Sequence, residues 1–126
     1  MVVKIKSVLL TFDIEEFDLP LEFGINISEK DQLEISRNGT EKIIELLNEA
    51  DIKATFFVSA KFAKSYPELI RKISKNHEIG LHCLEHKDDY SKIDEREAYE
   101  KIKTAKEIIE KIISKKVTGF RSPRFQ

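Results

Sequence analysis

Two histidines separated by three residues are the strongest chemical feature of this chain. His82 and His86 follow a short apolar run that predicts a strand over His77–His82. Two imidazoles at this spacing reach one point if the backbone turns between them. With one carboxylate they form a three-ligand site that leaves a position open for water, which is typical of catalytic metals and not of structural ones. The spacing alone is common, and the alternative is two unrelated polar residues in a solvated loop.

A run of carboxylates follows another predicted strand. Asp13 and Glu15 come after the apolar run Leu9–Phe12, and Glu16 and Asp18 lie just beyond them. In an extended segment, alternation places Asp13 and Glu15 on one side of the backbone. One of them could bind a metal while the other takes a proton from a water. Crowded carboxylates repel one another unless a cation offsets them, but a solvated loop suits Glu16 and Asp18 well.

Arg121 is the third candidate. It ends a strand predicted over Val117–Arg121, and Pro123 restricts Ser122 to extended backbone, which stiffens the segment. A guanidinium at this place could hold Asp13 ionised and oriented through a two-pronged contact. The alternative is a solvated cation at the surface.

The histidine pair, the acidic run and Arg121 each lie at the carboxyl end of a predicted strand. Strands are expected over Val2–Phe12, Ala54–Ser59, His77–His82 and Val117–Arg121. Helices are expected between the strands. The first is capped at Ser28 and Asp31, and Gly39 interrupts it, so its secure part is Thr40–Ala50. The second covers Lys61–Lys75, where Pro67 suits the start of a second piece, and the third is long and capped at Ser91 or Asp94. Leu19–Lys30 is expected to be a loop.

This βαβαβαβ order favours an α/β fold with parallel strands and right-handed crossovers. In such folds the chemistry lies at the carboxyl ends of the strands, where all three candidate regions fall.

Composition sets further limits. The chain has 126 residues, enough for one domain, but short of the roughly 250 residues of an eight-stranded βα barrel. Its 22 basic and 23 acidic residues give a net charge of −1, so no nucleic acid or anionic membrane is expected as a partner. No apolar run reaches the ~18–20 residues that cross a bilayer. Met1–Asp13 does not read as a signal peptide, and the single Cys83 has no partner for an internal disulfide, so a cytoplasmic location is expected.

Together these motifs resemble the polysaccharide deacetylase family, whose domain is the NodB homology domain. The resemblance runs over essentially the whole chain and rests on Thr11–Asp13, Ala54–Val58, Pro67–Ile70, His77–His82 with His86, and Gly119–Pro123. It implies the first half of a distorted (β/α) barrel. It also implies removal of acetyl groups from N-acetylated carbohydrates, or cleavage of other amide or imide bonds in some branches, with Zn²⁺ or a related divalent metal.

Position by position, the resemblance implies Asp13 as the catalytic base and Arg121 as the residue that holds it. It implies His82 and His86 as metal ligands. The substrate-binding residues expected near the arginine motif are Ser122, Pro123 and Phe125.

Two positions depart from the common pattern of the family. Ile14 stands where a second aspartate usually binds the metal. In one branch the acids are spaced one apart, and Glu15 then takes the ligand role, with Glu16 as the alternative. Cys83 stands where serine or threonine is usual, and we expect it to be a small buried neighbour rather than a soft ligand.

The family's later strands supply another acid, groove walls and a histidine that acts as general acid, and this chain ends before them. We therefore expect one domain over residues 1–126, truncated on its C-terminal side, with weak or no activity alone. A second hypothesis is an incomplete domain that acts as a homodimer or with a partner chain that supplies the missing part. A signalling receiver domain is a distant third, because it needs an aspartate after the third strand, where this chain has His82.

Overall fold

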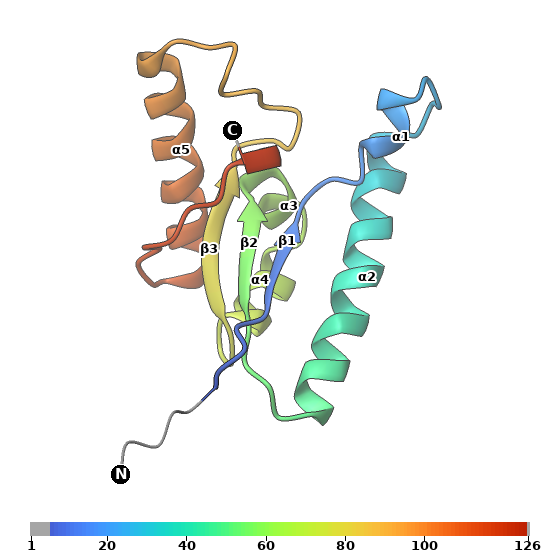
Figure 1. Ribbon diagram of the computed structural model, residues 1–126, viewed down its shortest axis with the longest axis vertical. Coiled ribbons are helices and arrows are strands. Elements are labelled where there is room, and N and C mark those ends of the chain that lie inside the picture. The colour runs from blue at the N-terminus through green and yellow to red at the C-terminus, as the bar shows by residue number, and fades with distance from the viewer. Residues whose placement is uncertain (1–5, 126) are drawn as a thin grey trace.

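Three short parallel strands form the sheet of the computed structural model, which describes residues 6–125. The strands are β1 (Thr11–Ile14), β2 (Thr55–Ser59) and β3 (Glu78–Cys83), and they lie side by side in the order β1-β2-β3. Thr11 is opposite Thr55, and Thr55 is opposite Glu78, so the strands start level with one another. Their carboxyl ends therefore meet at one edge of the sheet, at the top of Figure 1.

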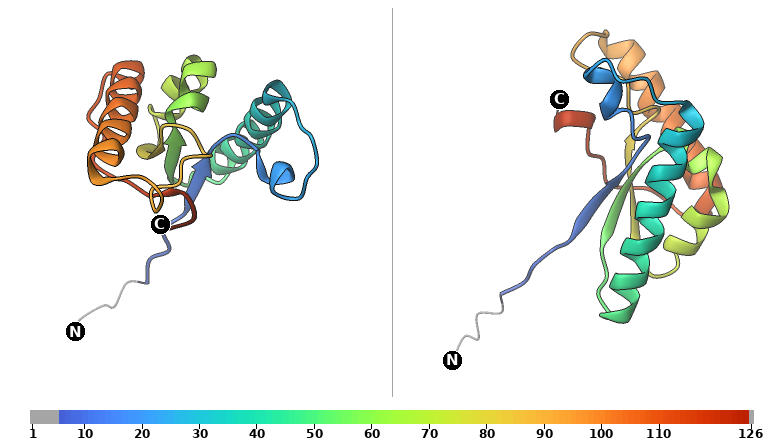
Figure 2. Two further views of the ribbon diagram at one scale, coloured as in Figure 1. Left: turned by 90° about the horizontal axis from the view of Figure 1, so that it is seen from above. Right: turned by 90° about the vertical axis from the view of Figure 1, so that its right-hand side faces the viewer.

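The helices lie mainly on one face of this sheet. They are α1 (Leu19–Glu22), α2 (Glu29–Glu49), α3 (Ala60–Ser65), α4 (Pro67–Ile73) and α5 (Glu95–Ile113), and a 3₁₀ turn, η1 (Pro123–Phe125), follows. Figure 2 shows α2, α3, α4 and α5 on the same side of the strands, with α1 and η1 near the carboxyl ends. Parallel strands covered by helices confirm the predicted α/β class.

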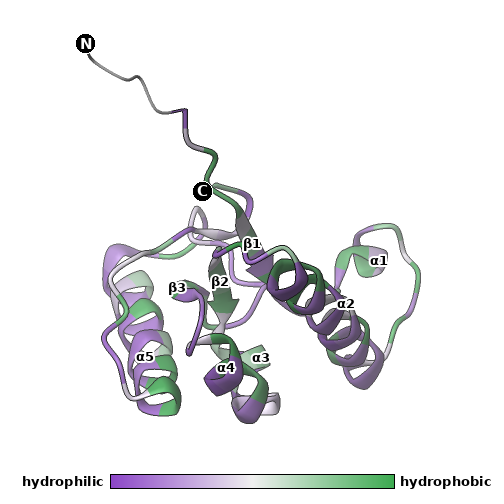
Figure 3. Ribbon diagram, turned by 90° about the horizontal axis from the view of Figure 1, so that it is seen from below, coloured by the Kyte–Doolittle hydropathy of each residue, from purple (hydrophilic) through white to green (hydrophobic). Residues whose placement is uncertain are grey.

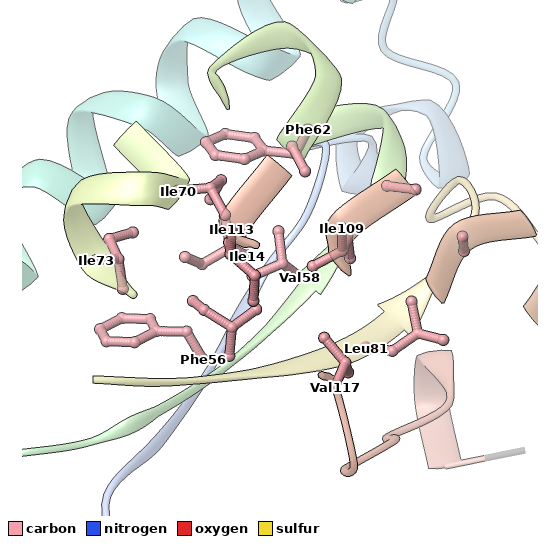
Figure 4. Close-up of a cluster of buried hydrophobic side chains, with 14 of the residues drawn as sticks. Ile14, Phe56, Val58, Phe62, Ile70, Ile73, Leu81, Ile109, Ile113 and Val117 are labelled. Carbon is pink, nitrogen blue, oxygen red and sulfur yellow. The ribbon is translucent and has the colours of Figure 1, made fainter. Parts of the chain in front are cut away.

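The hydrophobic core fills the space between the sheet and these helices. Ile14, Phe56 and Val58 point from the strands toward the helices, and each is at most 2% exposed. The helices contribute the other large buried side chains labelled in Figure 4, namely Phe62, Ile70, Ile73, Ile109 and Ile113. Figure 3 shows both hydrophobic and hydrophilic residues on α5, and its buried residues, Ala105, Ile109 and Ile113, are spaced by four, so they form one face of an amphipathic helix. The residues that alternate with these buried ones point to the other face of the sheet, where their side chains are available for a functional site.

Predicted helix boundaries that rest on capping are confirmed. The Ser28 hydroxyl accepts a hydrogen bond from the Asp31 backbone N–H at 3.1 Å, and the Asp94 carboxylate accepts one from Glu97 at 2.8 Å. Pro67 opens α4 directly after α3, so the stretch over Lys61–Lys75 is two helices. A cap satisfies a backbone donor that has no partner inside the helix, which is why these short signals locate helix starts.

Three predictions for the N-terminal third are wrong. Gly39 does not interrupt α2, which is continuous over Glu29–Glu49, because one glycine costs a long, well-packed helix only about 1 kcal/mol. Leu19–Lys30 is not all loop, since it contains α1 and the start of α2. The strand expected over Val2–Phe12 begins only at Thr11; residues 6–10 form no strand, and residues 1–5 lie outside the described residues.

The predicted fourth strand is also wrong in its extent. Val117–Arg121 makes a single parallel bridge, between Leu81 and Phe120. Leu81 donates to the Gly119 carbonyl at 2.8 Å, and Arg121 donates to the Leu81 carbonyl at 2.9 Å. The ladder stops there because Pro123 has no N–H to donate and the chain turns into η1. The two bonds still fix Arg121 beside β3.

Candidate active site

The carboxyl ends of β1 and β3 bring the acidic run and the histidine pair together. His82 lies within β3 and is 2% exposed, Glu15 follows β1 directly, and His86 lies in the loop after β3. One ligand atom from each of the three lies within 4.8 Å of the others. Glu15 Oε2 is 2.7 Å from His82 Nε2, and its Oε1 is 3.2 Å from His86 Nε2.

The hydrogen bonds of the two imidazoles leave their Nε2 lone pairs facing Glu15. His82 Nδ1 lies 2.8 Å from the Arg121 carbonyl oxygen, and His86 Nδ1 lies 2.7 Å from Asp18 Oδ1. Both partners are acceptors, so in the neutral rings we assign the hydrogen to Nδ1 and a lone pair to Nε2. The buried His82 Nε2 makes no hydrogen bond to a described residue, although Glu15 Oε2 lies 2.7 Å away.

Two imidazole lone pairs and a carboxylate that face one another match a divalent cation. Each imidazole also has an acceptor at its other nitrogen, and such an acceptor fixes the ring of a metal-binding histidine. The donor set of two nitrogens and one carboxylate is that of catalytic zinc sites. These residues therefore fit the metal that the sequence predicts.

Asp13 and Arg121 lie beside this cluster, on the sheet face opposite to α2, α3, α4 and α5. Arg121 Nη1 donates to Asp13 Oδ1 at 2.9 Å, and Nη2 donates to the Thr11 hydroxyl at 2.7 Å. The guanidinium also lies 4.2 Å from the centre of the Phe57 ring. The expected contact between arginine and aspartate is present, but the two-pronged form is wrong, because the second nitrogen binds Thr11. Asp13 itself lies within β1 rather than after it.

Two carboxylates that the sequence places in a solvated loop belong to the site, so that prediction is wrong. Glu16 is 4% exposed and accepts hydrogen bonds from the Ser59 hydroxyl at 2.5 Å and from the His86 backbone N–H at 3.3 Å. The Asp18 side chain is 14% exposed and binds His86. The chain turns inward across the ends of β2 and β3 after Ile14, and no local pattern predicts that direction. Ser59, the polar residue that ends β2, was the one available signal.

Cys83 behaves as the small buried neighbour that the sequence predicts. Its side chain is fully buried, and burial, with the nearby carboxylate of Glu16, raises the pKa of its thiol far above the usual range. A metal ligand must be the thiolate, so this environment disfavours Cys83 as a ligand.

A pocket of about 530 Å³ opens beside the cluster. Its lining includes the acidic run, both histidines and Phe125. Ser122 and Pro123 are not among the lining residues, and Pro123 is buried. Glu22 and Arg124, which also line the pocket, form an ion pair that joins α1 to η1. The pocket leads to the cluster from the side of α1 and α2.

Comparison with known proteins gives a consistent result. The family model described as polysaccharide deacetylase matches residues 2–125. A chitooligosaccharide deacetylase of Azorhizobium caulinodans is 34% identical over 86 residues, which are 67% of this chain and 40% of that protein. The structure of the peptidoglycan deacetylase PdaC from Bacillus subtilis matches with a TM-score of 0.69 and 26% identity over 92% of this chain and 48% of that one.

A third similar structure supports the fold alone. It is a pseudoenzyme of the CE4 family from Bacillus anthracis, with a TM-score of 0.70 and 21% identity over 94% of this chain and 35% of that chain. The chain spans less than half the length of each of these three proteins. Its three strands thus correspond to a partial segment of the (β/α) barrel of these structures, in agreement with the predicted fold. In residues 6–125, none of the helices has the length and apolar composition needed to span a bilayer.

Proposed function

This chain belongs to the polysaccharide deacetylase family, and we propose that it is a metal-dependent deacetylase that hydrolyses the N-acetyl amide of amino sugars. One observation carries the proposal: Glu15, His82 and His86 direct three acceptor atoms toward one point beside the Asp13–Arg121 pair. A metal site next to an oriented carboxylate is the arrangement that amide hydrolysis needs.

In this proposal Glu15, His82 and His86 hold the metal. Zn²⁺ is the metal that two imidazoles and one carboxylate suit best, because it accepts nitrogen and oxygen donors and leaves a position open. When bound, such a cation polarises an amide carbonyl and makes water a better nucleophile. The Nδ1 contacts of His82 and His86 hold the two rings oriented for this role.

Asp13 is the proposed base. It accepts the proton of the attacking water, while Arg121 holds its Oδ1 in place. The side chains of Asp13 and Arg121 are 33% and 22% exposed, so a substrate can reach them. The Thr11 hydroxyl fixes the second arm of the guanidinium.

The substrate class follows from the relatives and from the pocket. The chitooligosaccharide deacetylase and PdaC are named for carbohydrate substrates, and we propose an N-acetylated sugar for this chain. Phe125 is 83% exposed and lines the pocket, so its ring is available to pack on a sugar face. Ser122 and Pro123 are proposed to set the position of that ring. The cytoplasmic location and the association with a partner chain stay predictions from the sequence.

Metal content and acetate release test the proposal. The purified chain is expected to bind one Zn²⁺, and His82→Ala/His86→Ala to bind none; equal metal in both proteins would contradict the site. Acetate release from N-acetylglucosamine oligomers is expected to be weak or absent for this chain alone and, where it occurs, to require zinc. Asp13→Asn is expected to keep its metal and to lower release about 10²–10⁴-fold, the usual contribution of a general base. Undiminished release by this variant would exclude Asp13 as the base.

A further inference from the structure

We propose that Asp18 is a positioning residue that fixes the ring orientation and the tautomer of His86 for metal binding. The inference rests on the metal site proposed above and extends it to a residue that does not itself face the metal. Asp18 Oδ1 lies 2.7 Å from His86 Nδ1, on the opposite side of the ring from Glu15.

The contact between Asp18 and His86 is largely shielded from solvent, which strengthens its hydrogen bond. The side chains of Asp18 and His86 are 14% and 12% exposed. A hydrogen bond with a charged acceptor is roughly twice as strong as a neutral one, and shelter from solvent strengthens it further. An ionised carboxylate only accepts, so it selects the tautomer of His86 that carries hydrogen on Nδ1 and presents a lone pair at Nε2.

The backbone on both sides of this contact is already fixed. The His86 N–H donates to Glu16 at 3.3 Å, and the Asp18 N–H donates to the Glu16 carbonyl at 2.9 Å. What remains free is rotation of the His86 side chain about its own bonds. Asp18 contacts Nδ1, the ring nitrogen that does not face the proposed metal, so it limits that rotation.

The Asp18 side chain does not cap α1, although its position at the start of this helix predicts that it would. Asp18 is the N-cap of α1, where an aspartate usually accepts from the first turn of the helix, but its side chain makes no such bond. The carboxylate turns instead to a residue that is 68 positions away in sequence. Local capping therefore does not explain its orientation, whereas the histidine does.

The two histidines differ in what orients them. His82 Nδ1 faces the Arg121 backbone carbonyl, which no side-chain substitution removes. His86 Nδ1 instead faces a side chain, the carboxylate of Asp18. Loss of such a partner usually lowers metal affinity about 10–100-fold, so the site is expected to be sensitive to Asp18 through His86 alone.

The first test is Zn²⁺ affinity, measured on the full chain by competition with a chelating dye. Asp18→Ala is expected to bind about 10–100-fold more weakly than the wild type. Asp18→Asn keeps an oxygen acceptor without the charge, so its loss of Zn²⁺ affinity is expected to be smaller. This variant replaces Asp18→Ala in the test if Asp18→Ala does not fold. Glu22→Ala is the matched control, because it removes a carboxylate from the same pocket without touching His86. Equal losses in Asp18→Ala and Glu22→Ala would mean a general charge effect and would overturn the proposal.

The second test reads the tautomer of His86 in the metal-free protein by nitrogen-15 NMR of the imidazole ring at a pH where it is neutral. The wild type is expected to carry hydrogen on Nδ1, and Asp18→Ala to lose this preference, while His82 keeps it. A wild-type His86 protonated mainly on Nε2, or one unchanged in Asp18→Ala, would refute the role. If the wild-type chain binds no Zn²⁺, the proposed function fails, and the tautomer alone then decides the role of Asp18.

Discussion

Four carboxylates lie between Asp13 and Asp18, and each meets a different kind of partner. Asp13 binds an arginine, and Glu15 faces one nitrogen of each of two imidazoles. Glu16 accepts from a serine hydroxyl and a backbone N–H, and Asp18 contacts a single imidazole nitrogen. The four side chains are chemically alike. The proposed roles of Asp13 as base, Glu15 as ligand and Asp18 as positioning residue are set by what the folded chain places opposite each one.

His77, at the other end of the sheet, supports a prediction about pH. The Ala54 N–H donates to His77 Nδ1 at 3.2 Å, so this buried ring must be neutral to accept. Burial, together with the nearby charge of Lys53, lowers the pKa of His77. As the pH falls below about 6.5, the unfolded chain takes up a proton that the folded chain resists. The free energy of unfolding is therefore expected to be highest above that pH and to decrease below it.

Urea denaturation between about pH 5 and pH 8 measures this dependence. His77→Asn keeps an acceptor oxygen for Ala54 but does not titrate, so its stability is expected to change less with pH. The other two histidines are present in both proteins, and the difference between the profiles isolates His77. Parallel profiles would show that His77 does not contribute.

At the level of the elements, β3 approaches its neighbours closely at Gly80. A Cβ added there would lie 2.6 Å from Phe57 Cδ1 and 3.3 Å from the Gly119 carbonyl oxygen. The Phe57 ring, which carries the Arg121 guanidinium on its face, would have to move. Gly80→Ala is expected to lower the free energy of unfolding by about 1–3 kcal/mol, the usual cost of overpacking. Chemical denaturation measures this loss.

Gly39 provides the opposite case within α2. A Cβ added at this position meets no atom within 4 Å. Gly39→Ala is expected to raise the free energy of unfolding by about 0.5–1 kcal/mol, because alanine loses less conformational entropy in a helix. The same denaturation experiment tests both glycines. A destabilised Gly39→Ala would show that this turn of α2 needs glycine for a reason that its open surroundings do not reveal.

At the level of the whole molecule, the proposed metal would join β1 to β3 and to the loop after it. A ligand that binds only the folded chain stabilises it by mass action, by about 2.7 kcal/mol at a concentration of one hundred times Kd. Zn²⁺ at that concentration is expected to raise Tm by roughly 10 °C, and EDTA to reverse the change. Differential scanning calorimetry measures the shift, and His82→Ala is expected not to respond. A response of the same size in this variant would place the stabilising metal elsewhere.

Several features could be predicted from the sequence because they depend on short stretches of chain. The caps at Ser28 and Asp94, the break before Pro67 and the alternation around Ile14 each follow from a few neighbouring residues. The order of strands and helices then predicts a parallel α/β sheet. This order also indicates that the histidine pair and the acidic run share one edge, because carboxyl ends of parallel strands meet.

Other features were decided only by the tertiary structure. The Asp18–His86 contact joins residues 68 positions apart. Arg121 reaches Asp13 as predicted, but its second nitrogen binds Thr11, which the sequence did not indicate. The burial of Glu16 depends on a turn whose direction no periodicity encodes. The last predicted strand shrank to one bridge because Pro123 ends its pairing with β3. The sequence by itself determined which chemical groups are present and at which ends of the strands they lie. Their partners come from distant parts of the chain, and only folding brings those together.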